Sequence, residues 1–469
     1  MIAYPMVGGT VATVWVLVAS QLLLLVREVS RGQVTGVGGF LFMSFLFFGV
    51  RPIYMVMQSD YSLFTRLFLI RADMESVTSA MWWASAATFC FAVGADIAPR
   101  IFRRQLARRH ARNARPLAAA LVTNNMVGLL LGLQLITLPI MLRLAGIGRG
   151  VYGSSAGAYF YDLPVPLQAI HIMGVLVILQ RYMQRRDAVN LALLSVSGLM
   201  LLYFTWLMRD VTLFRGFYVA GLMVAGLTVI MELRGRAGYA WLILPVVILQ
   251  PFFQHLGQAR GVQNEEFQEE SVLEQVAEEQ TLSEAYWNFY RSNGDMNIFD
   301  TFAAAKAAEP SFYPYVWSWA YVPLHLIPRT LWSGKPPRGV TQDLRFLRGA
   351  PYSPGVAGFF LLDGGLVWML LSMLVLGFLI SLLDWFILTM PRGYLRYLMV
   401  GIITVNAMFL TRFFLWQYFY QMMYAMIPIL ALAWFFRRHQ KRQLLRARSP
   451  KLGMANCNEI AAPASRGGG

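Results

Sequence analysis

The chain has 469 residues, of which 57% are hydrophobic and 14% charged, and its formal net charge is +16. Ordinary soluble domains carry roughly 25% charged residues, so this composition excludes a soluble globular protein and indicates a polytopic membrane protein. Two cysteines, Cys90 and Cys457, are too few for a disulfide scaffold or a four-ligand zinc site.

A membrane-spanning helix needs about 20 apolar residues, because its backbone polar groups have to be satisfied inside the segment. About eleven apolar runs meet this requirement. They lie near 7–26, 34–50, 77–98, 117–142, 166–183, 188–207, 211–231, 238–256, 358–388, 396–411 and 416–436. The first run has no basic stretch before it and leads into further runs, so we expect a retained helix rather than a cleaved signal peptide. The predicted fold class is therefore all-α, a polytopic integral membrane helix bundle.

The orientation of the spans follows from their arginines and lysines, which concentrate in cytoplasmic connections. Segment 99–116 contains seven arginines and no acid, so we expect it in the cytoplasm. The basic connections at 27–31, 181–186, 234–236 and 392–396, and the tail from 437, fit the same alternation. The N-terminus is then expected outside and the C-terminus inside. Membrane topology accounts for most of the positive charge, and a nucleic-acid partner is not expected.

The spans divide the chain into four parts. We expect a bundle of eight spans in 1–256, a large external loop in 257–357, three more spans in 358–436, and a basic, disordered cytoplasmic tail in 437–469. The first half of the loop carries eight glutamates from Glu265 to Glu284 among apolar residues. This pattern favours an amphipathic surface helix over a divalent-ion site, which needs a defined cage of oxygens.

The second half of the loop is rich in aromatic residues, prolines and cations. Its prolines fix backbone angles and remove hydrogen-bond donors, which predicts a rigid, irregular cap over the bundle. Its aromatic rings suit the membrane interface or the stacking of sugars. Asp343 is the only acid among the cations Arg329, Lys335, Arg338, Arg345 and Arg348. Cations on an external segment oppose the usual charge distribution and favour an anionic ligand; contact with lipid headgroups is the alternative.

Two sequence elements carry a resemblance to a known family. The first is IPRTLWSGKP (Ile327–Pro336), and the second is the glycine-rich GVAGFFLLDGGLVWML at the start of a span. With one large, late loop between many spans, they resemble the Wzy-type oligosaccharide repeat-unit polymerases of bacterial envelopes. Phe359, Phe360 and Asp363 stand where members of that family often have a polar residue and an aromatic.

The resemblance implies a GT-C-like enzyme of the bacterial inner membrane. Such an enzyme transfers a glycan from undecaprenyl diphosphate to the nonreducing end of a second lipid-linked repeat unit at the periplasmic face. The implied chemistry uses no metal, cofactor or nucleotide sugar. A flippase and a chain-length regulator are the implied protein partners.

The diphosphate leaving group requires fixed positive charge. Arg329, Lys335, Arg338 and Arg345 are the first candidates to bind it, and Arg51 and Arg412, at the outer ends of spans, are the second. His325 is the first candidate for a base that accepts the proton of the acceptor hydroxyl, because imidazole titrates near neutral pH. Its alternative is an interfacial histidine bonded to backbone. Asp343 is the other catalytic candidate, with orientation of an arginine as its alternative role; the remaining external candidates are Asp363, Glu309 and His255.

Three other functions remain open. An O-antigen ligase would use the same donor with a different acceptor. A flippase or transporter of lipid-linked oligosaccharides would need charged residues deep in several spans, and Asp96 and Asp384 instead lie near the predicted cytoplasmic ends. A noncatalytic assembly factor would use the cationic cap as a docking surface.

Overall fold

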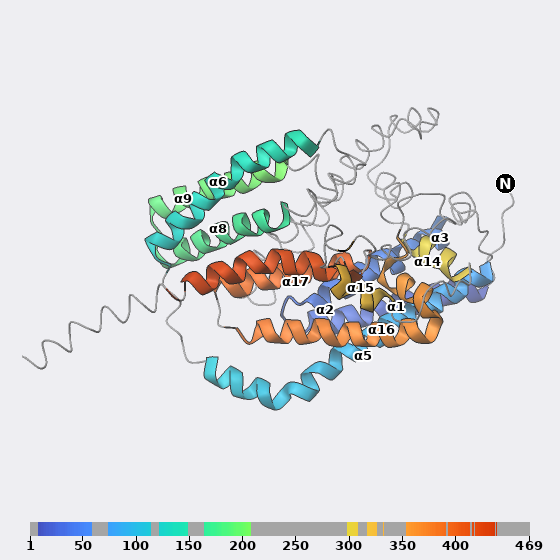
Figure 1. Cartoon of the computed structure of the whole chain (residues 1–469). Helices are drawn as coiled ribbons and strands as arrows, with labels where there is room; N and C mark the ends of the chain where they lie inside the picture. Colours follow the sequence, from blue (N-terminus) through green and yellow to red (C-terminus); the bar gives the residue numbers. More distant parts are fainter. Residues whose placement is uncertain are drawn as a thin grey trace, which may run out of the picture. The chain divides into compact units, whose positions relative to one another are not determined.

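The computed structural model describes residues 8–58, 74–113, 122–148, 164–207, 298–307, 317–325, 332, 353–390, 393–412, 415–416, 418–436 and 438. Regular structure in these ranges is helical throughout (Figure 1). The helices of the first half are α1 (Gly8–Val29), α2 (Gly36–Ser44), the π-helix η1 (Phe45–Val50), α3 (Arg51–Gln58), α5 (Met74–Asn113), α6 (Asn124–Gly148), α8 (Pro164–Gln184) and α9 (Ala188–Leu207). Those of the second half are α14 (Ile298–Ala307), α15 (Trp317–His325), α16 (Gly355–Leu388), α17 (Tyr394–Leu410) and the helical segment Tyr418–Phe436.

The predicted class of a helical membrane protein is confirmed for the described part of the chain. Five of its helices are long and apolar enough to cross a membrane: Thr10–Val29, Gly36–Ile53, Glu75–Phe102, Gly355–Leu388 and Tyr418–Phe436. A helix occupies every predicted span except 211–231 and 238–256, which lie outside the described residues. The total of eleven spans therefore stays a prediction.

Two helix boundaries differ from the sequence-based expectation. The helix expected from 117 begins at Asn124, because Thr123 accepts a hydrogen bond from the Met126 backbone N–H and caps the helix. The span expected to end at 98 continues through Pro99 as helix to Asn113. The arginine-rich connection after this span is thus helical over most of its length.

The described helices belong to two compact units. One contains the helices of Met1–Ala120 and Thr212–Met423, and the other contains those of Leu121–Val211 and the chain from Tyr424. The second unit packs α6, α8 and α9 around buried polar groups. There the Gln134 amide donates to the His171 carbonyl (3.1 Å) and to the Ser197 hydroxyl (2.9 Å). Such hydrogen bonds join helices where lipid supplies no hydrophobic driving force.

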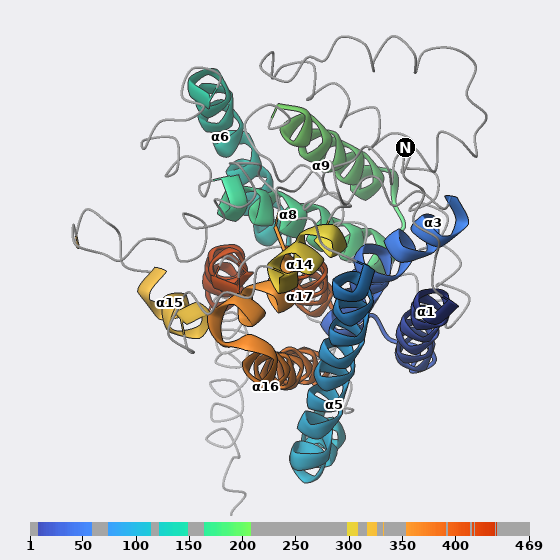
Figure 2. The same cartoon turned by 90° about the vertical axis from the view of Figure 1, so that its right-hand side faces the viewer.

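The core of the first unit is the close pair α5 and α16, which lie side by side in Figures 1 and 2. Gly94 of α5 lies against the backbone of Leu374, and Gly377 of α16 lies against the backbone of Phe91. A β-carbon at either glycine would collide with the carbonyl group of the other helix. Small residues therefore set the distance between these two helices, as is common between membrane helices.

The first unit has two distinct ends. At the basic end, Asp96 of α5 pairs with Arg27 (2.7 Å) in the last turn of α1 and with Arg31 (3.0 Å) just after that helix. At the same end, Asp384 accepts hydrogen bonds from the backbone N–H groups of Gly36 (2.6 Å) and Val37 (2.9 Å), the first residues of α2. Helices α1, α5 and α16 run toward this end, and α2 and α17 run away from it. These relative directions are compatible with the predicted alternation, and which end faces the cytoplasm stays a prediction.

Candidate functional site

The opposite end of the first unit, here called the loop end, brings together segments that are distant in sequence. Helices α14 and α15 of the loop pack beside the first turns of α16 (Figure 2). Gly355, the first residue of α16, lies against the carbonyl of Thr411 at the end of α17, and its φ of 71° is one that glycine adopts without strain. The loop end is therefore built from α3, α14, α15, the start of α16 and the end of α17.

Helix α14 carries the first polar feature of the loop end. Its sequence IFDTFAAAKA is apolar apart from a few positions, and residues 298–305 are buried. Phe302 and Phe299 meet Phe48 of η1 edge-to-face, with ring centroids 5.6 and 6.4 Å apart. This aromatic contact fixes the first turn of α14, and with it Asp300, against the start of α3.

Asp300 forms an ion pair with Arg51, the first residue of α3. The Arg51 Nη2 lies 2.9 Å from Asp300 Oδ2, and Nε lies 3.3 Å from the same oxygen. Both side chains are buried, with exposed fractions of 1% and 0%. Burial raises the pKa of Asp300, while the Arg51 guanidinium acts in the opposite direction. Arg51 follows a π-helix, a local distortion that is frequent at functional sites.

The second polar feature is Asp363 in α16. Its Oδ2 accepts a hydrogen bond from the Ser318 backbone N–H (2.9 Å) in the first turn of α15. Directly after it, Gly364 (φ −167°, ψ 23°) and Gly365 (φ 73°, ψ −168°) interrupt the helix. The side chain of Trp319 stacks on Phe360, with centroids 5.7 Å apart, and its Nε1 donates to Ser372 (3.1 Å). Asp363 and these aromatic contacts hold α15 on the interrupted part of α16.

The candidate residues from the sequence have different places in this arrangement. Arg51 lies in the buried pair with Asp300, and Arg412 is half-buried just beyond the end of α17, next to the Gly355 contact. His325 is the last residue of α15. Five candidates lie outside the described residues: Arg329, Lys335, Arg338, Asp343 and Arg345. The expected glutamate-rich helix and the other candidate bases Glu309 and His255 lie outside them as well.

Asp300 was not among the residues indicated by the sequence. A single acid in the apolar stretch NIFDTFAAAKAA is the signal that could have found it, because a buried carboxylate needs a partner. Its partner, Arg51, lies 249 positions away. Residue spacing along the sequence therefore could not predict that Asp300 and Arg51 form a pair.

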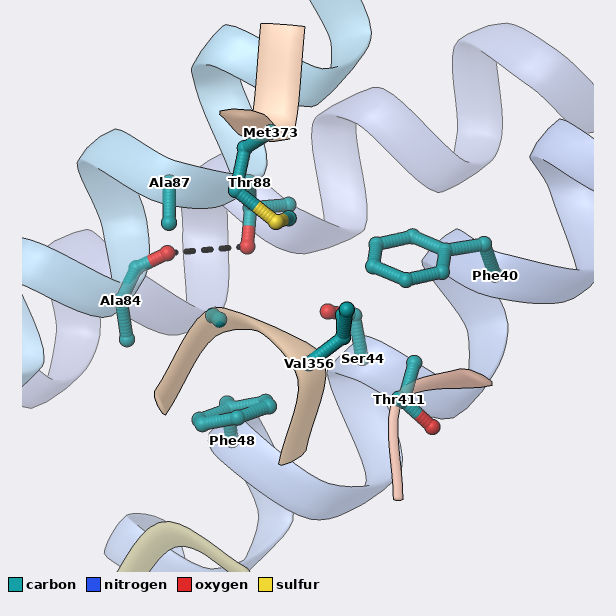
Figure 3. A pocket seen from close by; sticks show the side chains of 10 residues that line it. Phe40, Ser44, Phe48, Ala84, Ala87, Thr88, Val356, Met373 and Thr411 are labelled. Atoms are coloured by element: carbon teal, nitrogen blue, oxygen red, sulfur yellow. Dashed lines mark hydrogen bonds between the residues drawn. The ribbon is translucent and has the colours of Figure 1, made fainter. Parts of the chain in front are cut away.

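A cavity of about 10 Å³ lies beneath the start of α16 (Figure 3). It is lined by Phe40, Ser44, Phe48, Ala84, Ala87, Thr88, Val356, Ala357, Met373 and Thr411. Two lining hydroxyls donate to backbone within their own helices: Thr88 to Ala84 (2.9 Å) and Thr411 to Met408 (2.7 Å). This volume suits about one water molecule and is far too small for a diphosphate or a sugar.

The described residues contain no group of three or more His, Cys, Asp or Glu side chains placed to hold a metal ion. No protein-family model, no curated protein and no solved structure matches the chain.

Proposed function

We propose that this protein is a membrane-embedded glycosyltransferase that polymerises lipid-linked oligosaccharide repeat units at the outer face of the bacterial inner membrane. The donor is a glycan on undecaprenyl diphosphate, and the acceptor is a second lipid-linked repeat unit. In the reaction, an acceptor hydroxyl oxygen bonds to the anomeric carbon of the donor. The bond from that carbon to the diphosphate oxygen breaks, and undecaprenyl diphosphate leaves with the bonding electrons.

One observation supports this proposal most directly. The two sequence elements with the family resemblance are residues 327–336 and 355–370. Helix α15 ends at His325, two positions before the first element begins. The N-terminal turn of α15 is bonded to Asp363, which belongs to the second element. Helix α15, which precedes the cationic motif in the chain, is thus bonded to the glycine-rich segment. This contact supports a site shared by the two sequence elements.

The cations that follow α15 have the chemistry for the leaving group. Arg329, Arg338 and Arg345 can each hold phosphate oxygens with two parallel hydrogen bonds, and Lys335 adds a compact charge. Fixed cations stabilise the negative charge that develops on the diphosphate as the glycosidic bond breaks. In this proposal, charge stabilisation and the positioning of two lipid substrates supply most of the rate acceleration.

Arg51 and Arg412 have supporting roles in this proposal. The Asp300 carboxylate occupies one side of the Arg51 guanidinium and neutralises its charge, so the role of Arg51 in this proposal is to anchor α14. Arg412 lies at the turn beside the start of α16 and is the described cation that we assign to the diphosphate. His325 or Asp343 accepts the proton of the acceptor hydroxyl.

The experiment that tests the proposal is reconstitution. Purified protein in nanodiscs is given undecaprenyl diphosphate-linked repeat units extracted from the producing cells, with EDTA and without nucleotide sugar. We expect glycans of several repeat units on gels. Products that remain at one repeat unit, with a substrate that a known polymerase extends, would refute the proposal. A parallel reaction with added lipid A-core tests the alternative, since a ligase would transfer the glycan to that acceptor.

A further inference from the structure

Helix α16 carries two buried aspartates whose carboxylates are satisfied to different extents. Each oxygen of Asp384 accepts one backbone N–H of α2, from Gly36 (2.6 Å) and from Val37 (2.9 Å). Asp363, with an exposed fraction of 0%, accepts the Ser318 backbone N–H on Oδ2 (2.9 Å), and the Ser318 side chain also interacts with this carboxylate. Within the described part of the chain, its Oδ1 is buried and has no hydrogen-bond partner. The burial of Asp384 is therefore explained by its role as a cap at the start of α2. For Asp363, the contact with α15 accounts for Oδ2 and leaves Oδ1 without an explanation.

An unpartnered buried acceptor is costly. Leaving a buried polar group unsatisfied costs about 1–3 kcal/mol, and more for a charged group. Native proteins contain few such groups, and those that persist call for a specific explanation. A ligand that donates a hydrogen bond to Oδ1 would remove this cost.

The backbone beside Asp363 favours a ligand at this position. Gly364 and Gly365 interrupt α16, and interrupted helices in membrane proteins commonly occur where a substrate is bound, because their freed backbone groups need partners. A β-carbon at Gly365 would have no atom within 4 Å. The segment after Asp363 thus has local free space and backbone freedom.

The side chains around Asp363 indicate the chemistry of the ligand. Trp319, half-exposed and one residue after the Ser318 contact, stacks on Phe360, and Tyr321 meets Trp416 with centroids 6.0 Å apart. Binding sites combine apolar and aromatic walls with a few placed polar groups. A carboxylate acceptor beside aromatic rings suits a sugar, whose hydroxyls donate hydrogen bonds while its C–H face packs on a ring.

We infer that Asp363 Oδ1 accepts a hydrogen bond from a sugar hydroxyl of the lipid-linked glycan, so that Asp363 is a sugar-binding residue. This inference rests on the proposed function and adds to it a place for the saccharide. The sugar then lies beside the N-terminal turn of α15, whose Ser318 N–H bonds the other oxygen of Asp363.

The substitution Asp363→Asn tests this geometry. The amide oxygen can still accept from Ser318, while an NH₂ group takes the place of Oδ1, so an acceptor becomes a donor. Asp384→Asn is the matched control, because it is the same change on the same helix where both oxygens already have partners. The probes are undecaprenyl diphosphate alone and the undecaprenyl diphosphate-linked repeat unit extracted from the producing cells.

Binding is measured as the ligand-induced rise in Tm of the full chain in nanodiscs. We expect Asp363→Asn to bind undecaprenyl diphosphate like the wild type and to lose about 10- to 100-fold in affinity for the glycan-carrying lipid, as for a lost hydrogen bond to a charged group. Its Tm without ligand should not fall, whereas Asp384→Asn should have a lower Tm and an unchanged ratio of the two affinities.

Four outcomes overturn the inference. Wild-type affinity of Asp363→Asn for the glycan-carrying lipid would mean that Oδ1 faces only a buried water. A fall in unliganded Tm as large as that of Asp384→Asn, without selective loss of glycan binding, would mean a structural role. If the wild type binds undecaprenyl diphosphate but does not distinguish the glycan-carrying lipid, the inference fails alone. If it binds neither lipid, the proposed function fails too.

Discussion

Arg51 and Asp300, 249 positions apart in the chain, form a buried ion pair that joins the start of α3 to α14 (Nη2 to Oδ2, 2.9 Å). A buried charge without its partner is strongly unfavourable, whereas the intact pair adds little net stability. The pair therefore specifies where α14 docks.

We expect Arg51→Met and Asp300→Leu each to destabilise the protein by about 3–5 kcal/mol, because each leaves one buried charge unpaired. The double variant should recover most of this loss, since two apolar side chains replace both charges. Thermal unfolding of the wild type, the two single variants and the double variant in the same nanodiscs measures the interaction free energy between Arg51 and Asp300. Additive losses in the double variant would show that the two side chains do not interact.

Gly377→Ala should destabilise the protein by about 1–3 kcal/mol, the usual cost of overpacking. The new β-carbon would meet the Phe91 carbonyl, and α5 and α16 would have to separate. Gly128→Ala in α6 is the control, because a β-carbon there has no atom within 4 Å. Its only expected effect is a gain of up to about 1 kcal/mol from helix propensity. Equal Tm values for the two variants would contradict the close packing of α5 and α16.

The arginine distribution predicts which end of the first unit faces the cytoplasm. Ser30 is exposed near the basic end, and Pro323 is exposed on α15 at the loop end. In a variant without Cys90 and Cys457, we expect a cysteine at position 323 to react with a membrane-impermeant maleimide in intact spheroplasts. A cysteine at position 30 should react only after permeabilisation. The reverse labelling pattern would invert the topology and place the proposed site on the wrong side of the membrane.

Arg329→Lys should reduce glycan polymerisation by at least about tenfold, the factor that 1.4 kcal/mol of lost transition-state stabilisation gives. The substitution retains the charge and removes the planar fork that binds two phosphate oxygens. Arg392→Lys, in a predicted cytoplasmic connection, is the matched control and should keep the wild-type chain lengths on gels. Unchanged polymerisation by Arg329→Lys, at equal protein level, would remove Arg329 from the diphosphate site.

Sequence reasoning was most successful where the bilayer constrains the chain. Long apolar runs have to form helices, so a helix occurs at each predicted span within the described residues. The exact ends were less predictable. Pro99 did not end α5, because the turns before and after it continue the helix. Thr123 caps α6, so this helix begins later than expected.

The site was less accessible to sequence reasoning. The resemblance selected segments 327–336 and 355–370, but it gave no reason to place Ser318 on Asp363 or Asp300 on Arg51. These contacts join residues 45 and 249 positions apart. Each contact depends on how the helices pack. The periodicity of a sequence shows which face of a helix is apolar, but it does not show which other helix packs against that face.

The sequence alone determined that this is a helical membrane protein, because a water-free core permits few backbone conformations, and it gave the expected orientation through the positions of its arginines. The tertiary structure decided which buried polar groups meet. Asp384 has a partner for each oxygen, whereas Asp363 retains an unpartnered oxygen beside a broken helix. That difference arises because hydrogen bonding in a membrane core depends on the placement of neighbouring helices, which the chain fixes only when it is folded.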